Sequence, residues 1–558
     1  MSAKGLNIGR RDFLKASGLT AAAAAFTTCV GAGSAPKADA CDLSKIFPSK
    51  KQNPPEIVFD VDNPIVQTTA GKVRGFIDNG IYTFRGIPYA EAARFEEPHA
   101  PTAWDGVKNC VVYGGIAPQE PLRLKASAML MSPTYWPMDE NCQKLNVWSK
   151  DVTAEKPVMV WIHGGYYSTG SSNEQAGYDG RNLCENGDVV VVSINHRLNC
   201  LGYLDLSAYG EEYRYSANNG MLDIIAALQW VQDNISNFGG DPSNVTVFGQ
   251  SGGAIKIMNL LAMPAAEGLF HKCILQSGRN TCMVPEESRL VAQLLFSELG
   301  VAEGNISELV NMPYEKIRVA GDTALKKASE QVGHSLAWSA IVDGVSQQIC
   351  AWEAHPFPEK GGKIPMIIGN CFAEKSSNTV DMIGGKDWQK NSWDEATVNQ
   401  KLTDKYGDKK DAVVEAFKKA YPDKKIADVL YYDTVFRGSA KTVLPARAEA
   451  SAPVYNYIFA YEAPNMGGLM SFHCADIPFV FGNVSKHALA NGAGEEGHKL
   501  ESIMLGAWSA FAHTGDPNHS GMIDWPAYTN ENGATMIFEK ECRIGYHHDD
   551  ELMALLLG

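Results

Sequence analysis

The chain has 558 residues, of which 45% are hydrophobic and 9% aromatic, a composition sufficient for a large buried core. Its formal net charge is −15, and no basic run with interleaved aromatic residues occurs beyond the N-terminal segment. These properties exclude a disordered or fibrous protein and argue against a general nucleic-acid binder. No later segment approaches the length of an uninterrupted apolar membrane span. We therefore expect a soluble acidic protein.

The N-terminus has the features of an export signal. The pair Arg10-Arg11 precedes a mildly apolar segment that includes the alanine run 21–25, an order typical of a twin-arginine (Tat) signal. Residues 38–40 read Ala-Asp-Ala, an A-x-A cleavage site, so residues 1–40 are predicted to be a Tat-type export signal. Cys29 follows the apolar run and is an alternative site for a lipid anchor. The mature protein is predicted to be periplasmic, bound to the cell surface or secreted.

The first part of the mature chain is predicted to form short antiparallel strands. From residue 57 to 95, apolar and polar residues alternate between Gly and Asn turns, as such strands do. Residues 156–162 (KPVMVWI) are mostly apolar, as expected for a central strand buried on both faces. A glycine-rich turn, HGGYY, follows at 163–167, and its N–H groups would face the crevice where α/β sheets bind ligands. A plain turn between a strand and a helix is the alternative.

Strands and helices then alternate along the chain. Apolar residues at helical spacing between 219 and 238 predict a helix. Runs with the length of buried strands lie at 188–194, 272–276 and 363–369. This alternation predicts a mostly parallel α/β sheet.

Two charged segments interrupt the alternation. Residues 285–330 and 383–445 are rich in helix-forming residues and turns, and they are predicted to be cap or peripheral helices inserted between strands. No linker clearly separates two domains. We therefore expect residues 41–558 to form a single catalytic domain.

Residues 244–263 carry the strongest chemical signal. A run typical of a buried strand leads into a G-x-S-x-G turn at 249–253, and a segment compatible with a helix follows. In this strand–turn–helix context the motif indicates a nucleophile elbow with Ser251 as the nucleophile. The turn strains the serine backbone, so the residues two before and two after it must be small, and both are Gly. A tight glycine turn with an incidental serine is the alternative.

A nucleophile of this kind needs an acid and a histidine that follow it in the chain. Glu374 follows a predicted strand and is the favoured acid, whereas Asp343 precedes that strand and is ranked lower. His473 follows the last predicted strand, at 454–461, and precedes an apolar stretch. It is the favoured base, because several other histidines after Ser251 lie in polar surroundings, namely His487, His498, His513, His547 and His548.

The cysteines suggest one disulfide bond and no metal site. Export permits disulfides, and Cys110 and Cys142, which bracket a loop-rich segment, are the best candidate pair. Cys371 and Cys474 lie near the candidate acid and base, so a bridge between those two loops is a second hypothesis. No C-x-x-C spacing or His/Cys cluster occurs, and neither a metal nor a cofactor is predicted.

The motifs together resemble the type-B carboxylesterase/cholinesterase family over nearly all of the mature length. Besides the elbow and the HGG turn, the resemblance rests on residues 84–90 (FRGIPYA) and 140–142 (ENC). Later matches, in family order, lie at 238–242 (FGGDP), 369–374, 473–482 and 514–518 (TGDPN). The resemblance implies an α/β-hydrolase fold, in which helices flank a large, mixed, mostly parallel sheet.

The same resemblance implies roles for particular residues. Ser251 corresponds to the nucleophile, Glu374 to the triad acid and His473 to the general base and acid. The other implied features are an oxyanion hole made of the backbone N–H groups of Gly165, Tyr166 and Gly252, and a disulfide bond between Cys110 and Cys142.

Three positions depart from the family pattern. Gln250 replaces the glutamate usual before the nucleophile, which removes a negative charge and weakens a cholinesterase interpretation. Tyr166 replaces a Gly or Ala and should narrow the part of the site that binds the acyl group, while its backbone N–H remains available. Lys375 replaces the Gly usual after the acid.

We expect an exported serine carboxylesterase that hydrolyses small-molecule carboxylic esters through a Ser-His-Glu triad and an acyl-enzyme intermediate. Hydrolysis of amides, carbamates or lactones at the same site is an alternative, because the same triad serves all of them. A non-catalytic binding protein on this scaffold is the other alternative. The filled triad positions argue against it.

Overall fold

The computed structural model describes residues 56–120, 130–279, 282–352, 357–376 and 390–558. The predicted export signal at 1–40 and the possible lipid site at Cys29 lie outside these ranges. None of the helices within them is long and apolar enough to cross a bilayer.

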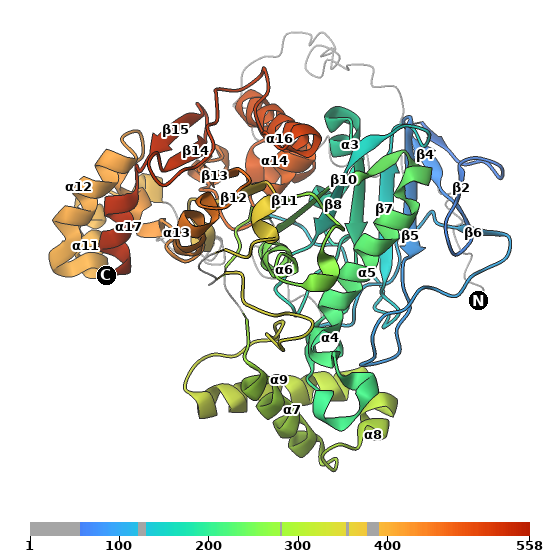
Figure 1. Ribbon diagram of the computed structural model, residues 1–558. Coiled ribbons are helices and arrows are strands. Elements are labelled where there is room, and N and C mark those ends of the chain that lie inside the picture. The colour runs from blue at the N-terminus through green and yellow to red at the C-terminus, as the bar shows by residue number, and fades with distance from the viewer. Residues whose placement is uncertain (1–55, 121–129, 280–281, 353–356, 377–389) are drawn as a thin grey trace, which may run out of the picture. The chain divides into compact units, whose positions relative to one another are not determined.

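A sheet of 12 strands lies at the centre of the described structure (Figure 1). Its strand order is β1-β4-β5-β7-β9-β8-β10-β11-β12-β13-β14-β15. The pairs from β9 to β14 are parallel, and those from β1 to β9 and between β14 and β15 are antiparallel. The predicted α/β-hydrolase fold, with its large, mixed, mostly parallel sheet, is therefore confirmed.

The strands have the following bounds. The large sheet contains β1 (Ile57–Val58), β4 (Phe76–Asp78), β5 (Ile81–Pro88), β7 (Lys144–Ser149), β8 (Lys156–Ile162), β9 (Val190–Ile194), β10 (Gly240–Gln250), β11 (Lys272–Gln276), β12 (Met366–Cys371), β13 (Val454–Phe459), β14 (Ala534–Phe538) and β15 (Arg543–Tyr546). A separate sheet contains β2 (Ile65–Gln67), β3 (Lys72–Arg74) and β6 (Val107–Asn109).

The central strands are buried on both faces. Side chains of β8 alternate between two hydrophobic clusters, with Val158 and Val160 in one cluster and Met159 and Trp161 in the other. All four are fully buried. Because successive side chains of a strand point to opposite faces, an almost continuously apolar sequence is what a doubly covered strand requires.

Helices cover the two faces and form two outer groups. In Figure 1, α7, α8 and α9 lie together below the sheet, and α11, α12 and α17 lie beside its β14–β15 edge. The helices are α3 (Arg181–Gly187), α4 (Asn199–Tyr203), α5 (Asn219–Asn234), α6 (Gly252–Leu260), α7 (Pro285–Leu299), α8 (Ile306–Asn311), α9 (Tyr314–Val332), α11 (Glu395–Tyr406), α12 (Lys410–Ala420), α13 (Val435–Ala448), α14 (Ile477–Phe481), α15 (Ala488–Asn491), α16 (Glu495–Thr514) and α17 (Asp550–Leu557).

Most predicted elements are present, with some shifted bounds. The strands predicted at 156–162 and 272–276 coincide with β8 and β11, and helices occupy much of the two charged insertions. The strand predicted at 363–369 begins instead at Met366, because a turn of 3-10 helix precedes it and Pro365 has no N–H to donate. The strand predicted at 454–461 is not the last, since β14 and β15 follow it.

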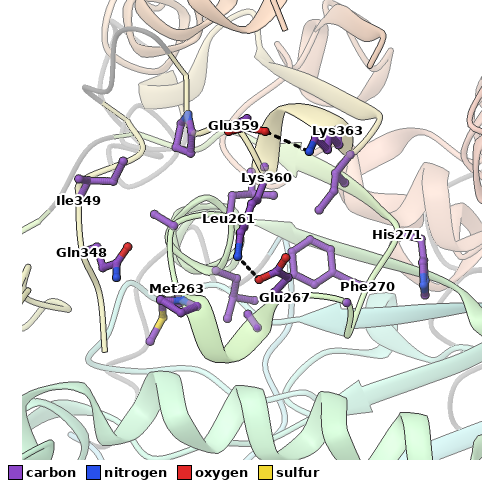
Figure 2. A pocket seen from close by; sticks show the side chains of 18 residues that line it. Leu261, Met263, Glu267, Phe270, His271, Gln348, Ile349, Glu359, Lys360 and Lys363 are labelled. Carbon is purple, nitrogen blue, oxygen red and sulfur yellow. Dashed lines mark hydrogen bonds and ion pairs between the residues drawn. The ribbon is translucent and has the colours of Figure 1, made fainter. Parts of the chain in front are cut away.

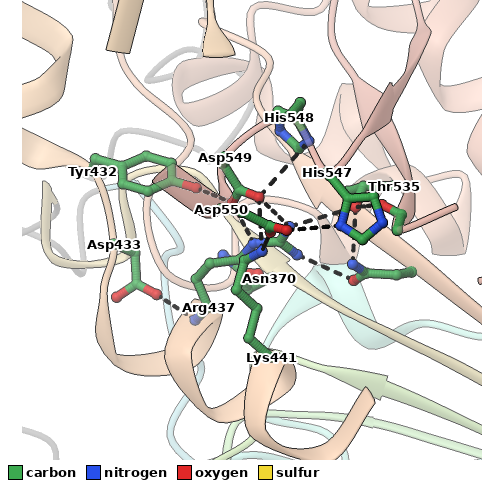
Figure 3. Close-up of polar contacts among 12 residues, drawn as sticks. Asn370, Tyr432, Asp433, Arg437, Lys441, Thr535, His547, His548, Asp549 and Asp550 are labelled. Atoms are coloured by element: carbon green, nitrogen blue, oxygen red, sulfur yellow. Dashed lines mark hydrogen bonds and ion pairs between the residues drawn. The ribbon is translucent and has the colours of Figure 1, made fainter. Parts of the chain in front are cut away.

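A buried ion pair ties α13 to the residue that precedes α17 (Figure 3). Arg437 donates to both carboxylate oxygens of Asp549, from Nε at 2.7 Å and from Nη2 at 2.9 Å. Tyr432 donates to the same carboxylate at 2.6 Å. A pair this well satisfied holds its elements in register, since a buried charge without its partner is costly. It matters for the site, because the neighbouring Phe436 stacks on His473 with ring centroids 4.9 Å apart.

Candidate active site

Ser251 occupies a strained turn between β10 and α6. Its φ is 55° and its ψ is −120°, a region that residues with a side chain rarely adopt. A Cβ on Gly253 would lie 1.9 Å from the carbonyl oxygen of Ile162, and one on Gly249 would lie 2.6 Å from the same atom. The requirement for small residues on both sides of the serine is therefore physical: each glycine lies against the backbone of β8.

Glu374 and His473 are in direct contact. His473 Nδ1 lies 2.5 Å from Glu374 Oε2, and the backbone N–H of His473 donates to the carbonyl oxygen of Glu374 at 3.0 Å. The second carboxylate oxygen accepts hydrogen bonds from Ser277 Oγ at 2.6 Å and from the N–H of Cys371 at 2.7 Å. The carboxylate is therefore fully engaged and fixes both the orientation and the tautomer of the imidazole.

The pKa of His473 reflects this pairing. Burial alone would lower it, but the charge and the hydrogen bond of Glu374 outweigh burial and raise it above the ordinary histidine value. Two further buried carboxyl groups, Asp476 and Asp433, act in the same direction. Burial, followed by the charge of Glu374, raises the pKa of Asp433 to about 7.

The rival acid, Asp343, lies elsewhere. Its carboxylate accepts hydrogen bonds from Ser346 Oγ at 2.5 Å and from the N–H of Gln347 at 2.9 Å, so it caps its own turn. His163 and His196 are buried and stacked on each other with centroids 4.8 Å apart. Burial lowers the pKa of both rings, that of His163 to about 3, so both are neutral.

Gln250 lies between the nucleophile turn and the imidazole. Its Nε2 is 3.2 Å from His473 Nε2, and its Oε1 accepts a hydrogen bond from Cys474 Sγ at 3.2 Å. Within the described part of the chain, no hydrogen bond joins His473 to Ser251 Oγ. The same amide nitrogen lies 3.4 Å from His473 Nδ1, so it stands against the ring at nearly equal distances from both nitrogens.

The backbone of Tyr166 lies directly against Gly252. A Cβ on Gly252 would be 2.4 Å from the Tyr166 nitrogen and 2.5 Å from its Cα and carbonyl oxygen. Gly165 and Tyr166 have φ values of 85° and 56°. The three residues predicted for the oxyanion hole thus meet beside Ser251.

Lys256 and Arg279 adjoin this loop and were not singled out from the sequence. Lys256 is fully buried on α6, and its Nζ donates to the carbonyl oxygen of Tyr166 at 2.5 Å. The Arg279 guanidinium lies over the Tyr166 ring, 5.0 Å from its centroid. The only signal in the sequence for the first of these residues was a lysine inside the mostly apolar helix that follows the elbow.

The predicted disulfide bond between Cys110 and Cys142 is not formed. Both are free thiols in the structure, and they pack in different hydrophobic clusters. Burial raises the pKa of both thiols, that of Cys110 to about 12. Cys371 and Cys474 are free as well, so the hypothesis of a bridge between the acid and base loops is also wrong. Among the described residues, no group of His, Cys, Asp or Glu could hold a metal ion.

A cavity of about 700 Å³ lies away from these residues, near the C-terminal end of α6 (Figure 2). Leu261, Met263 and Phe270 contribute to its lining, but none of Ser251, Glu374 and His473 does. Its principal charges pair within the chain, Lys360 with Glu267 and Lys363 with Glu359. The cavity therefore lies outside the candidate active site.

Comparison with known proteins identifies the family. A model of the carboxylesterase family matches residues 62–553, and a model of the twin-arginine translocation signal matches residues 7–27. The chain is 33% identical over 504 residues to para-nitrobenzyl esterase of Bacillus subtilis, covering 86% of this chain and 96% of that protein. It is 33% identical over 500 residues to phenmedipham hydrolase of Pseudarthrobacter oxydans, with the same two coverages.

A solved structure is similar over nearly the whole described fold. It belongs to an esterase from the anaerobe Clostridium hathewayi that can hydrolyse aliphatic aromatic polyesters, with a TM-score of 0.84 and 39% identity. The alignment covers 90% of this chain and 99% of that one. The Tat signal directs this protein out of the cytoplasm, to the periplasm or the extracellular space. The chain belongs to the carboxylesterase family and is a carboxylic-ester hydrolase.

Proposed function

We propose that Ser251, His473 and Glu374 form a catalytic triad that hydrolyses carboxylic esters through an acyl-enzyme intermediate. The observation that carries the proposal is the contact of 2.5 Å between His473 and the buried Glu374, next to a serine in the strained geometry of a nucleophile elbow. A carboxylate with both oxygens engaged can orient the imidazole and stabilise its cation.

In the first half-reaction, Ser251 Oγ attacks the ester carbonyl carbon while His473 Nε2 takes the hydroxyl proton. The N–H groups of Gly165, Tyr166 and Gly252 stabilise the oxyanion. The bond to the alcohol oxygen breaks, and His473 returns the proton to the leaving alcohol. Water then attacks the acyl-enzyme with the same proton transfers and releases the acid.

Gln250 adds one step to this reaction. Its amide nitrogen stands against the ring of His473, 3.2 Å from Nε2 and 3.4 Å from Nδ1, so this contact must shift as the imidazole comes to accept the serine proton. A neutral amide gives way at low cost, because a single uncharged hydrogen bond contributes only about 1 kcal/mol.

The proposal is tested with the Ser251→Ala variant. Hydrolysis of a short-chain para-nitrophenyl ester and labelling by a fluorophosphonate probe should both be lost, with the thermal unfolding midpoint unchanged. A variant that still hydrolyses the ester at the wild-type rate would exclude Ser251 as the nucleophile. Release of soluble acid from an aliphatic aromatic polyester film would show whether the chain shares the activity of its Clostridium hathewayi relative.

A further inference from the structure

Arg279 follows the residues that contact the candidate triad. β11 ends at Gln276, whose carbonyl oxygen accepts a hydrogen bond of 2.8 Å from the N–H of Ser251. The next residue, Ser277, donates to Glu374. Arg279 therefore follows, two residues later, a residue that contacts the candidate triad.

The Arg279 guanidinium lies on the ring of Tyr166, the residue whose backbone packs against Gly252. Both side chains are partly exposed. Because Gly252 is the residue after Ser251, the paired ring and cation belong to a residue that lies beside the candidate nucleophile.

This cation has no anionic partner in the described part of the chain. No carboxylate forms an ion pair with it, and its Nε is buried without a hydrogen-bond partner there. Burial lowers the pKa of Arg279, and among the described residues no acidic group opposes that effect. By contrast, the buried Arg197 and Arg437 pair with Asp223 and Asp549 at 2.8 and 2.7 Å.

A guanidinium without a carboxylate partner among the described residues is unusual in a chain with 64 acidic and 49 basic residues. Contact with an aromatic face recovers only part of the lost hydration, about 0.5–1 kcal/mol at exposed sites. A guanidinium presents a planar fork of donors that matches a carboxylate. The missing partner is therefore best supplied by an anion that arrives with the substrate.

We propose that Arg279 binds a carboxylate of the substrate, so that the preferred substrates are esters bearing a second, free carboxylate, such as half-esters of dicarboxylic acids. The inference rests on the proposed function of Ser251. The carboxylate can belong to the acyl half or to the alcohol half of the ester, and a paired set of substrates separates these two sources.

The experiment compares matched anionic and neutral esters. Ethyl hydrogen adipate and ethyl hexanoate differ only at the far end of the acyl chain, and ω-acetoxyhexanoate and hexyl acetate differ only at the far end of the alcohol. In one of the two pairs, the wild type should prefer the anion, and Arg279→Met should lower kcat/KM for that anion by about tenfold or more. The same variant should leave kcat/KM for the neutral partner within about twofold, and Arg279→Lys should restore part of the preference.

Two results would overturn the inference: a wild type with no preference for either anion, or a preference that Arg279→Met retains. A binding measurement keeps the question separate from catalysis. Ser251→Ala should bind ethyl hydrogen adipate or ω-acetoxyhexanoate in calorimetric titrations, and Ser251→Ala/Arg279→Met should not. Equal binding by both variants refutes the role of Arg279 even if the proposed triad stands. Loss of binding in the double variant supports the role of Arg279 even if Ser251 proves not to be the nucleophile.

Discussion

Lys256 Nζ donates a hydrogen bond of 2.5 Å to the carbonyl oxygen of Tyr166. A buried basic side chain on the helix that follows Ser251 thus holds the loop whose N–H groups would form the oxyanion hole. The surrounding charged and titratable groups are Glu174, His163 and His196. Because α6 also begins at the residue after the nucleophile, one helix sets the positions of both the serine and the loop.

Replacing Lys256 with Met should therefore lower kcat by about tenfold to a hundredfold with little change in KM, since misplaced oxyanion donors affect mainly the transition state. Lys272→Met is the matched control, because Lys272 is also buried but bonds to Asn244 within β10. That control should keep the wild-type kcat. Steady-state kinetics on a short-chain ester decide the question, and a Lys256→Met enzyme with unchanged kcat would contradict the positioning role.

The same lysine predicts a pH dependence of stability. Burial lowers the pKa of Lys256 to about 7, although Glu174 opposes the effect, whereas an unfolded lysine has a pKa of about 10.4. Between these values the unfolded chain binds more protons, so the stability contributed by this site rises with pH. The penalty of burying the ammonium group is complete below about pH 7 and disappears towards pH 10.

Urea unfolding of the wild type and Lys256→Met at about pH 7 and pH 9 measures this effect. The free energy of unfolding of the variant, relative to the wild type, should fall as the pH rises. Burial raises the pKa of Glu174 to about 7, and Lys256 opposes that rise. In Lys256→Met this opposition is lost, so the pKa of Glu174 should rise further and the variant should lose additional stability as the pH rises. A difference that does not change with pH would mean that the buried lysine is not titrating in this range.

Glu374→Gln should reduce kcat by about a thousandfold or more, because the imidazole loses the group that fixes its tautomer and stabilises its cation. The carboxylate also outweighs burial in setting the pKa of His473, so its removal should lower that pKa. The unprotonated imidazole is the active form, and the acid limb of the kcat/KM profile should therefore move to lower pH. An acid limb that stays at the wild-type pH would show that His473 does not control it.

Gln250→Glu should have the opposite effect on the pH profile. Its carboxylate would stand near His473 Nε2, where the amide nitrogen now lies at 3.2 Å, and would raise the pKa of the ring. The acid limb should move upward by about 1 pH unit. Gln250→Ala removes the amide without adding charge and should leave the limb near its wild-type position. Equal shifts in the two variants would mean that the lost hydrogen bond, and not the added charge, changes the pKa of His473.

The sequence predicted those features that depend on residues close together in the chain. The continuous apolar run of β8, the elbow and the order of serine, acid and histidine follow from periodicity, glycine spacing and chain order. The contact between Glu374 and His473 agrees with that order. Each residue lies in the loop that follows one of two neighbouring parallel strands, β12 and β13.

Features that depend on partners in space were not predictable. Nothing near Lys256 or Arg279 in the sequence shows that one bonds to the loop of Tyr166 and the other covers its ring. The disulfide bond expected between Cys110 and Cys142 failed for the same reason: their spacing in the chain does not reveal that the two thiols pack in separate clusters.

The elbow itself gives the sharpest test of stability. Gly253→Ala would set a Cβ 1.9 Å from the carbonyl oxygen of Ile162 and 3.1 Å from that of His163, both in backbone that cannot yield without distorting the end of β8. The free energy of unfolding should fall by about 3 kcal/mol or more. Gly438→Ala, in α13, is the matched control: its Cβ would meet nothing closer than 3.8 Å, and the helix should gain about 0.5–1 kcal/mol. Chemical denaturation of the two variants measures the contrast. If both changed stability equally, close packing of the elbow on β8 would not be the reason for glycine at this position.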